Sequence, residues 1–291
     1  MSASARYHVR HATACAYASD VVHSQQLLHL VPRPAPHQQC LEHEISVSPG
    51  TYRRRDEVDA FGNPITRIEI EQPHRELEVV SAMVVDIYAR AAFRPTESVP
   101  WEQVAEQLRF KGHAPSRENL EACRFRHESP YVRVKQIFSD YAQDCFPPGR
   151  PLAACAYDLM TKLHRELKYS PGATTVATPV TEVLEIRRGV CQDFAHLMIS
   201  CLRSRGLAAR YMSGYVKSSM SGAASHAWVA LYTPPFGWLE LDPTNDTLAG
   251  TEHIGIAWGR DFGDVSPLRG SILGGGTHQL SVSVDVTRLN P

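Results

Sequence analysis

The chain has 291 residues, of which 43% are hydrophobic and 21% are charged. That composition is typical of soluble globular proteins and argues against disordered, collagen-like and coiled-coil chains. The formal net charge is −1 and no block of basic residues occurs, so we expect neither a nucleic-acid nor a membrane partner. The seven cysteines are scattered without a CxxC pair, which argues against a structural zinc site and a disulfide framework.

The N-terminal residues carry no recognisable targeting signal. They lack the apolar run of about 7–15 residues that a signal peptide requires. No stretch approaches the ~18 consecutive apolar residues of a membrane-spanning helix. We therefore expect a cytoplasmic protein whose thiols are reduced.

The first of two expected domains covers residues 1–92. It contains short alternating runs broken by turn residues such as Pro49-Gly50, a pattern that predicts a small β-rich domain, either a sandwich or a barrel. Many charged residues lie in its middle section, as expected where one face of a sheet meets solvent. The clearest of its five or six strands are expected at residues 26–30, 41–47, 65–70 and 77–87.

The second expected domain, residues 93–291, starts with a helical segment. Ser129-Pro130 predicts the start of one helix and Pro151 the start of the next, because Ser caps helix N-termini and Pro is favoured at the first helical position. Gly274-Gly275-Gly276 is interpreted as a flexible turn that no strand precedes and that leads into a strand at residues 280–286. The mixture of helices and strands in separate parts of the chain predicts an α+β fold.

Residues 189–242 contain the most informative pattern. A helix with a buried face is expected from Cys191 to about Gly206, followed by strands at 211–215, 226–232 and 238–242. A thiol at a helix N-terminus faces the positive end of the helix dipole, which favours the thiolate. Attack on an acyl carbon also needs a nearby base and a group that orients this base.

The last two of these strands carry a suitable base and a carboxylate. If their hairpin closes near residue 234, His226 and Asp242 face each other across the ladder, with Cβ atoms about 4.5–5.5 Å apart. The carboxylate then fixes one tautomer of the imidazole and stabilises its charged form. The alternative is that Cys191 is an inert packing residue, and we interpret the other six cysteines in that way.

Several short motifs are distributed over nearly the whole chain. They are Gly189–Ala195, Ala209–Tyr215, Ser225–Val229, Gly237-Trp238, Asp242–Asn245, Gly259–Phe262, Asp264–Pro267, Leu30–Pro34 and Phe61–Asn63. These motifs resemble those of bacterial transglutaminase-like proteins, a family also described as cysteine proteases. The resemblance implies a papain-like, transglutaminase-like catalytic core after the β-rich domain. It also implies that Cys191 is the nucleophile, His226 the base and acid, and Asp242 the orienting group, and that the reaction passes through an acyl thioester.

A tetrahedral intermediate also needs hydrogen-bond donors near the thiol. The backbone N–H of Cys191 is the natural first donor. Tyr169, Gln192 and Trp228 are candidates for the oxyanion or substrate site. For Tyr169 the alternative is an aromatic side chain packed beneath a loop, and Asp193 is interpreted as a first-turn acid favoured by the helix dipole.

The leading functional hypothesis is a cysteine-dependent hydrolase of the peptidase or amidase type. It would act on an amide or isopeptide bond without a metal or an organic cofactor, so we expect a peptide or another amide-containing substrate. One alternative is transglutaminase-type transfer of the acyl group to an amine. Another is a non-catalytic module that binds a partner, although a pure binder has no need for all three residues of the triad. The sequence gives no indication of the oligomeric state.

Overall fold

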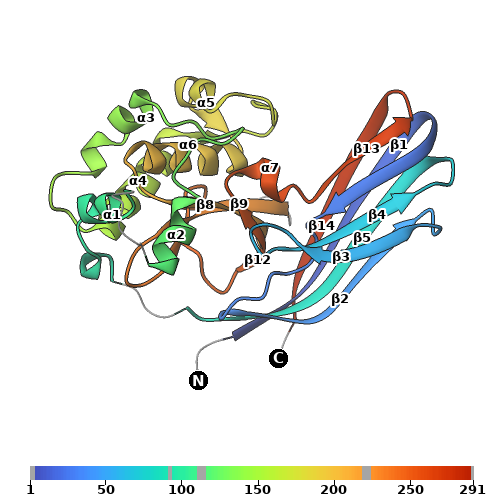
Figure 1. Ribbon diagram of the computed structural model, residues 1–291, viewed down its shortest axis with the longest axis horizontal. Coiled ribbons are helices and arrows are strands. Elements are labelled where there is room, and N and C mark those ends of the chain that lie inside the picture. Colours follow the sequence, from blue (N-terminus) through green and yellow to red (C-terminus); the bar gives the residue numbers. More distant parts are fainter. Residues whose placement is uncertain (1–3, 91–93, 110–115, 218–223, 290–291) are drawn as a thin grey trace.

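The computed structural model describes residues 4–90, 94–109, 116–217 and 224–289. A curled β-sheet region lies beside a mixed region of helices and strands (Figure 1). In the described part of the chain, seven strands form the sheet of the first region. They are β1 (Ser4–Leu28), β2 (Gln38–Ser48), β3 (Arg53–Val58), β4 (Pro64–Ile70), β5 (His74–Tyr88), β13 (Leu268–Gly274) and β14 (His278–Leu289).

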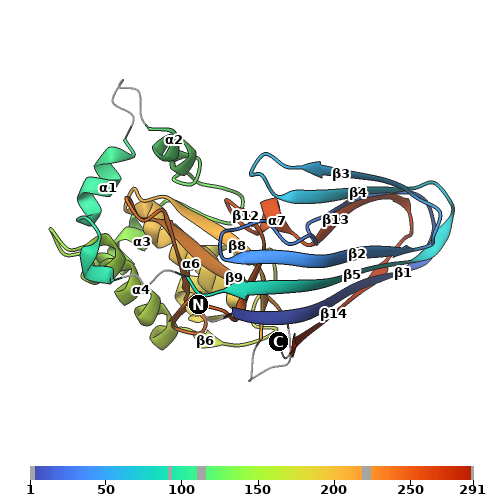
Figure 2. The same cartoon turned by 90° about the horizontal axis from the view of Figure 1, so that it is seen from below.

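The long strand β1 organises this sheet. Its first half pairs with β5 and β14, and its second half pairs with β4 and β13. Because one strand belongs to both halves, the sheet curls over (Figure 2) and encloses an apolar core that includes Leu28, Ile68 and Leu77. The β-rich region predicted from the sequence is confirmed, but the strand expected at residues 26–30 is the end of a much longer one.

The C-terminal strands differ from the expected division of the chain. A boundary between residues 92 and 93 assigns β13 and β14 to the second domain, whereas both pair with β1 in the first sheet. The glycine turn at 274–276, with φ angles of 96°, 83° and 62°, joins these two strands, so a strand does precede it. The strand expected at residues 280–286 is confirmed as part of β14, in which apolar residues alternate with polar ones from Leu280 to Val286. Most side chains of β13 are exposed and its residues do not alternate in this way, so the sequence does not reveal that strand.

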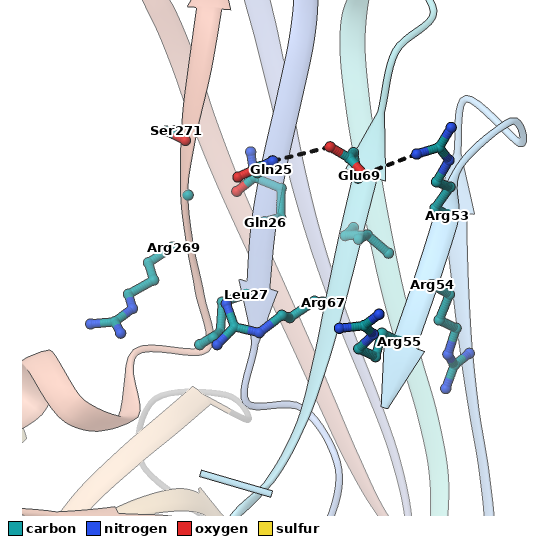
Figure 3. A pocket seen from close by; sticks show the side chains of 12 residues that line it. Gln25, Gln26, Leu27, Arg53, Arg54, Arg55, Arg67, Glu69, Arg269 and Ser271 are labelled. Atoms are coloured by element: carbon teal, nitrogen blue, oxygen red, sulfur yellow. Dashed lines mark hydrogen bonds and ion pairs between the residues drawn. The ribbon is translucent and has the colours of Figure 1, made fainter. Parts of the chain in front are cut away.

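The solvent-facing surface of β13, β1, β4 and β3 is strongly charged (Figure 3). It forms a hollow of about 770 Å³, in which Glu69 accepts a hydrogen bond from Gln25 at 3.0 Å and pairs with Arg53 at 3.8 Å. Arg67 pairs with Glu57 at 2.9 Å. Because β3 is an edge strand, its charges oppose pairing with other chains, which accounts for the charged middle section of the first domain.

In the mixed region, helices cover one face of a second sheet. Among the described residues its strand order is β11-β10-β9-β8-β12, and α6 packs against β8 and β9. The helices are η1 (Pro95–Glu97), α1 (Trp101–Gln107), α2 (Arg117–Cys123), α3 (Gln136–Tyr141), η2 (Gln143–Cys145), α4 (Leu152–Glu166), α5 (Val180–Ile186), α6 (Cys191–Ser204) and α7 (Phe262–Val265). The strands are β6 (Lys168–Tyr169), β7 (Arg188–Gly189), β8 (Ala209–Val216), β9 (Ala224–Tyr232), β10 (Trp238–Asp242), β11 (Thr247–Leu248) and β12 (His253–Gly259).

The helix starts expected from the sequence have mixed outcomes. The helix predicted to start at Cys191 is confirmed, and Gly206 follows its end with φ 78°. Pro151 is the N-cap of α4, close to its expected role. The start expected at Ser129-Pro130 is wrong, because α3 begins at Gln136 and Ser129 forms a bridge with Val132. Within the described ranges, no helix has both the length and the apolar character needed to cross a membrane.

Two side-chain amides of the first region bind the backbone of the edge strand β12. Gln38 donates to the Gly255 carbonyl at 2.7 Å and accepts from its N–H at 2.8 Å. Asn63 does the same with Trp258, at 2.8 and 3.0 Å. Each amide reproduces the pair of hydrogen bonds that a neighbouring strand would provide. The two regions are therefore joined through backbone groups that would otherwise be buried without partners.

The Asn63 contact gives a first prediction. Asn63→Ala leaves the N–H and C=O of Trp258 unpaired at a half-buried position, and each such group costs about 1–3 kcal/mol. We expect the free energy of unfolding in urea to fall by about 2–4 kcal/mol. Gln107→Ala, at an exposed position at the end of α1, is the control and should change it by less than about 0.5 kcal/mol. Equal effects of the two substitutions would contradict the structural role of Asn63.

Candidate active site

Cys191 is the first residue of α6, and the residues around it fix its position. The carboxylate of Asp193 accepts hydrogen bonds from the Val190 backbone N–H at 2.8 Å and from the Thr174 hydroxyl at 2.6 Å. Asp193 therefore folds back over the start of the helix, as a first-turn acid favoured by the dipole should. A Cβ at position 189 would lie 2.5 Å from this carboxylate, so Gly189 is required for the turn that presents the thiol.

The imidazole of His226 lies between the thiol and a carboxylate. His226 is near the start of β9, and Asp242 is the last residue of β10. The distance from His226 Nε2 to Asp242 Oδ2 is 2.7 Å, and the Cys191 side chain is near enough to His226 to raise the pKa of the imidazole. Because Nε2 faces Asp242, Nδ1 is the ring nitrogen left for the thiol. The structure thus brings together the three residues selected from the sequence.

The register of the hairpin differs slightly from the expected one. Leu241 pairs with Val229, which centres the turn on residue 235 rather than 234. Continued by one step, this register places Asp242 opposite Trp228. His226 is then the diagonal neighbour on the same face, a separation that longer side chains still bridge.

The carboxylate of Asp242 is fully buried and surrounded by donors. Its Oδ1 accepts from the backbone N–H groups of Thr244 at 3.0 Å and Asn245 at 3.2 Å. Its Oδ2 accepts from the Asn245 amide at 2.7 Å and from His253 Nε2 at 3.1 Å, in addition to His226. Burial alone would raise the pKa of Asp242, but the hydrogen bonds from the two histidines outweigh it and hold this pKa well below its usual range. Asp242 is therefore a permanent negative charge at neutral pH.

The electrostatics of His226 follow from those of its neighbours. Burial alone would lower the pKa of His226, but the hydrogen bonds to Asp242 and Cys191 and the negative charges of both groups raise it to about 10. The imidazolium is therefore the favoured form at neutral pH. A cationic imidazole beside a thiol at a helix N-terminus is the arrangement that promotes thiolate chemistry.

His253 is a residue of this site that sequence reasoning missed. It is the first residue of β12, is 4% exposed, and donates to Asp242. Its ring packs against Trp228 in a T-shaped contact with 5.3 Å between centroids. No spacing rule points to a single histidine that follows a loop, so only the packing of β12 beside β8 reveals it.

Trp228 has a different place from the one expected. As a candidate for the oxyanion or substrate site it should expose its N–H, but its side chain is fully buried and Nε1 donates to Glu240 at 2.6 Å. The ring stacks on His226 with 6.1 Å between centroids. Glu240 is itself paired with Arg90 at 2.6 Å. Trp228 therefore supports the imidazole from behind and has no free donor for substrate.

Tyr169 and Gln192 lie next to Cys191. Tyr169 pairs with Gly189, two residues before the thiol, and its side chain is 45% exposed, which contradicts packing beneath a loop. Partial burial and the negative charge of Cys191 raise the pKa of the Tyr169 hydroxyl, so this group stays a neutral donor. Gln192 is half-buried on the first turn of α6. Both remain candidates for contacts with the substrate.

The other cysteines are less suited to nucleophilic chemistry. Burial raises the pKa of the thiols of Cys15, Cys145, Cys155 and Cys201, to about 12 for Cys155. Cys40 differs from the packing role expected of it, because it is exposed. Among the described residues, no group of three or more His, Cys, Asp or Glu side chains is arranged to hold a metal ion.

Two protein-family models match the chain. The model of the bacterial transglutaminase-like N-terminal region matches residues 7–86. The model of the transglutaminase-like superfamily matches residues 139–243, which include Cys191, His226 and Asp242.

Individual proteins extend this similarity over the full chain. An uncharacterised protein of Mycobacterium tuberculosis is 37% identical, over 98% of this chain and 94% of its own length. A protein-glutamine gamma-glutamyltransferase of Pseudomonas aeruginosa is 30% identical, over 30% of this chain and 15% of its own. The crystal structure of a Cytophaga hutchinsonii protein described as a "Putative Cysteine Protease" has a TM-score of 0.77 at 19% identity, and the match covers 100% of this chain and 92% of the other. This structure has the same fold.

The close approach of Gly189 to Asp193 gives a second prediction. Gly189→Ala displaces the Asp193 carboxylate and with it the start of α6. We expect alkylation of Cys191 by iodoacetamide at pH 7 to slow by about 10-fold or more, because small displacements of a reacting group are costly. Gly50→Ala is the matched control, since a Cβ there meets nothing within 4 Å. A normal rate in the Gly189 variant would show that this turn does not position the thiol.

The charges of His226 and Asp242 give a third prediction. The lowered pKa of Asp242 contributes stability above its unfolded pKa of about 3.9, and the raised pKa of His226 contributes fully below about 6.5. The latter contribution is lost as the pH rises through about 10. The difference in unfolding free energy between the native protein and Asp242→Asn should therefore be largest between about pH 4 and 6.5 and fall progressively towards pH 10.

Asp86→Asn is the control for this pH profile. Asp86 pairs with Arg6 at 2.7 Å, and a guanidinium keeps its charge throughout that range. The corresponding difference for Asp86 should stay flat from pH 6.5 to 10. A flat profile for Asp242 as well would contradict the assigned charge of His226.

Proposed function

The chain belongs to the transglutaminase-like superfamily and contains its bacterial N-terminal region; on that premise we propose that it is a cysteine-dependent hydrolase that cleaves an amide or isopeptide bond. Cys191 is the nucleophile, His226 the acid and base, and Asp242 the group that orients His226. The observation that carries this proposal is that His226 is held 2.7 Å from the buried Asp242 and interacts with the Cys191 side chain, which helps to raise the pKa of the imidazole.

The first half of the reaction forms an acyl thioester. The Cys191 thiolate attacks the carbonyl carbon and forms a C–S bond. The His226 imidazolium gives its proton to the nitrogen as the C–N bond breaks, so the amine leaves neutral and the imidazole becomes neutral. As the first residue of α6, Cys191 has a backbone N–H without an intrahelical acceptor, and in this proposal that group and the Tyr169 hydroxyl stabilise the oxyanion.

The second half returns the enzyme to its starting state. The neutral imidazole takes a proton from water while the remaining hydroxide adds to the thioester carbon. The C–S bond then breaks, which releases the carboxylic acid and restores the thiolate and the imidazolium. Asp242 remains ionised throughout and stabilises the imidazolium each time it forms.

Transfer to an amine is the second candidate function. An amine would replace water in the same second step and leave as a new amide. The match to a protein-glutamine gamma-glutamyltransferase supports this alternative, although it covers only 30% of this chain. A peptide or another amide-containing molecule is the substrate in both cases.

Selective alkylation tests the proposed nucleophile. With sub-stoichiometric iodoacetamide at pH 7, we expect Cys191 to react at least about 10-fold faster than the exposed Cys40, because only Cys191 has an imidazolium partner. His226→Ala should remove most of this difference. A Cys191 that reacts no faster than Cys40 would contradict the proposal and favour a binding module.

Product analysis separates hydrolysis from transfer. Candidate peptides are incubated with and without a primary amine, and released ammonia or peptide is compared with incorporated amine. We expect release without incorporation, and Cys191→Ala should lower the rate by about 10³-fold or more. Incorporation that depends on Cys191 would instead assign amine transfer.

A further inference from the structure

His253 binds the same carboxylate oxygen as His226. Its Nε2 is 3.1 Å from Asp242 Oδ2, the same oxygen that accepts from His226. The rings of the two histidines are 6.4 Å apart and inclined by 60°, so they approach this oxygen from different directions. Asp242 therefore links two imidazoles, of which one contacts Cys191.

The tautomer of His253 is determined by its other nitrogen. Nδ1 accepts a hydrogen bond from the backbone N–H of Gly250 at 3.3 Å, and a nitrogen that accepts a hydrogen bond carries no proton. The proton of the neutral ring therefore lies on Nε2 and is donated to Asp242. His253 is a neutral donor in this arrangement and needs no charge of its own.

The position of His253 is fixed by the first region of the protein. His253 opens β12, and two residues further on, Gly255 is bound on both backbone groups by Gln38. Asn63 holds Trp258 in the same way. On its other side β12 pairs with β8, and the His253 ring packs on the fully buried Trp228. The donor therefore has little freedom to move away from Asp242.

We propose that His253 is a positioning residue for the reaction proposed above: its Nε2–H holds the Asp242 carboxylate in the orientation that directs Oδ2 to His226. Without this donor, Asp242 keeps the two backbone N–H groups on Oδ1 but loses one of the three donors on Oδ2. A carboxylate held less firmly orients His226 less well, and the imidazolium beside Cys191 is then less stable. The inference rests on the proposed function, and it assigns the N-terminal region a part in forming the site.

Three substitutions separate positioning from packing. His253→Gln places its amide donor near the original Nε2, whereas His253→Asn has the same chemistry but is too short to reach Asp242. His253→Leu keeps much of the volume without a donor. We expect alkylation of Cys191 at pH 7 to fall by about 10-fold in the Asn and Leu variants, as for a displaced reacting group. The Gln variant should stay within about 3-fold of the native rate, because the donor is retained.

Urea unfolding of each variant shows whether lost stability explains a slower reaction. Rates that follow stability, with Gln as slow as Asn, would overturn the positioning role, and so would a native rate in the Leu variant. A positioning role requires that the Gln and Asn variants differ in rate at similar stability.

A second measurement does not depend on the reactivity of Cys191. Long-range ¹H–¹⁵N correlation spectra of the native protein at pH 7 should show His253 protonated on Nε2 only, and the His226 ring signals should shift in His253→Leu but not in His253→Gln. A proton on Nδ1 of His253 would overturn the inference. If Cys191 shows no selective alkylation while the His253 tautomer is as expected, the proposed function fails and the positioning of Asp242 stands.

Discussion

An ionised carboxylate with no contact to solvent is costly unless hydrogen-bond donors replace the lost water. Asp242 is 0% exposed, and its donors come from a loop that follows it, from β9 and from β12. Each of these elements must be in place before the charge is compensated. The arrangement of the second sheet around β10 is therefore also the arrangement that gives His226 its partner.

The N-terminal region contributes to this arrangement although none of its side chains touches Cys191, His226 or Asp242 in the contacts between described residues. Gln38 and Asn63 complete the free edge of β12, and Arg90 compensates the buried Glu240 that holds Trp228. Two sets of contacts therefore link the first region to the partners of the His226 imidazole. One runs through β12 and His253 to Asp242, and the other runs through Glu240 to Trp228, which stacks on the imidazole. This explains physically why the motifs around Arg33 and Asn63 occur together with those of the catalytic core: Arg33 donates to Asn63 at 2.9 Å and its guanidinium stacks on Trp258.

The sequence predicted local features well. The start of α6 at Cys191 follows from its apolar periodicity, and the shared face of His226 and Asp242 follows from the even spacing along two strands. Trp228 was misjudged because its burial depends on Glu240 and His253, which periodicity does not connect to it. The sequence does not reveal His253 or β13 for a related reason, since both are recognised through packing with residues far away in the chain, whereas the strand expected at residues 280–286 lies within β14. The centre of the hairpin differs from the expected one by one residue, which moves the partner of Asp242 by two residues, because the register depends on the geometry of a turn that contains two consecutive prolines.

The pairing of β1 with β14 has a consequence for synthesis of the protein. Arg6 pairs with Leu289, so the ends of the described chain lie side by side (Figure 1). In the sequence, the mixed region is therefore inserted between strands that belong to one sheet. On the ribosome, domains usually fold in order as they emerge, but here β1 leaves the exit tunnel long before β13 and β14 exist. Until then one edge of the longest strand stays open to other nascent chains. Pairing with β13 and β14 closes this edge once both strands have been made, so strands near one end of the sequence protect a strand near the other.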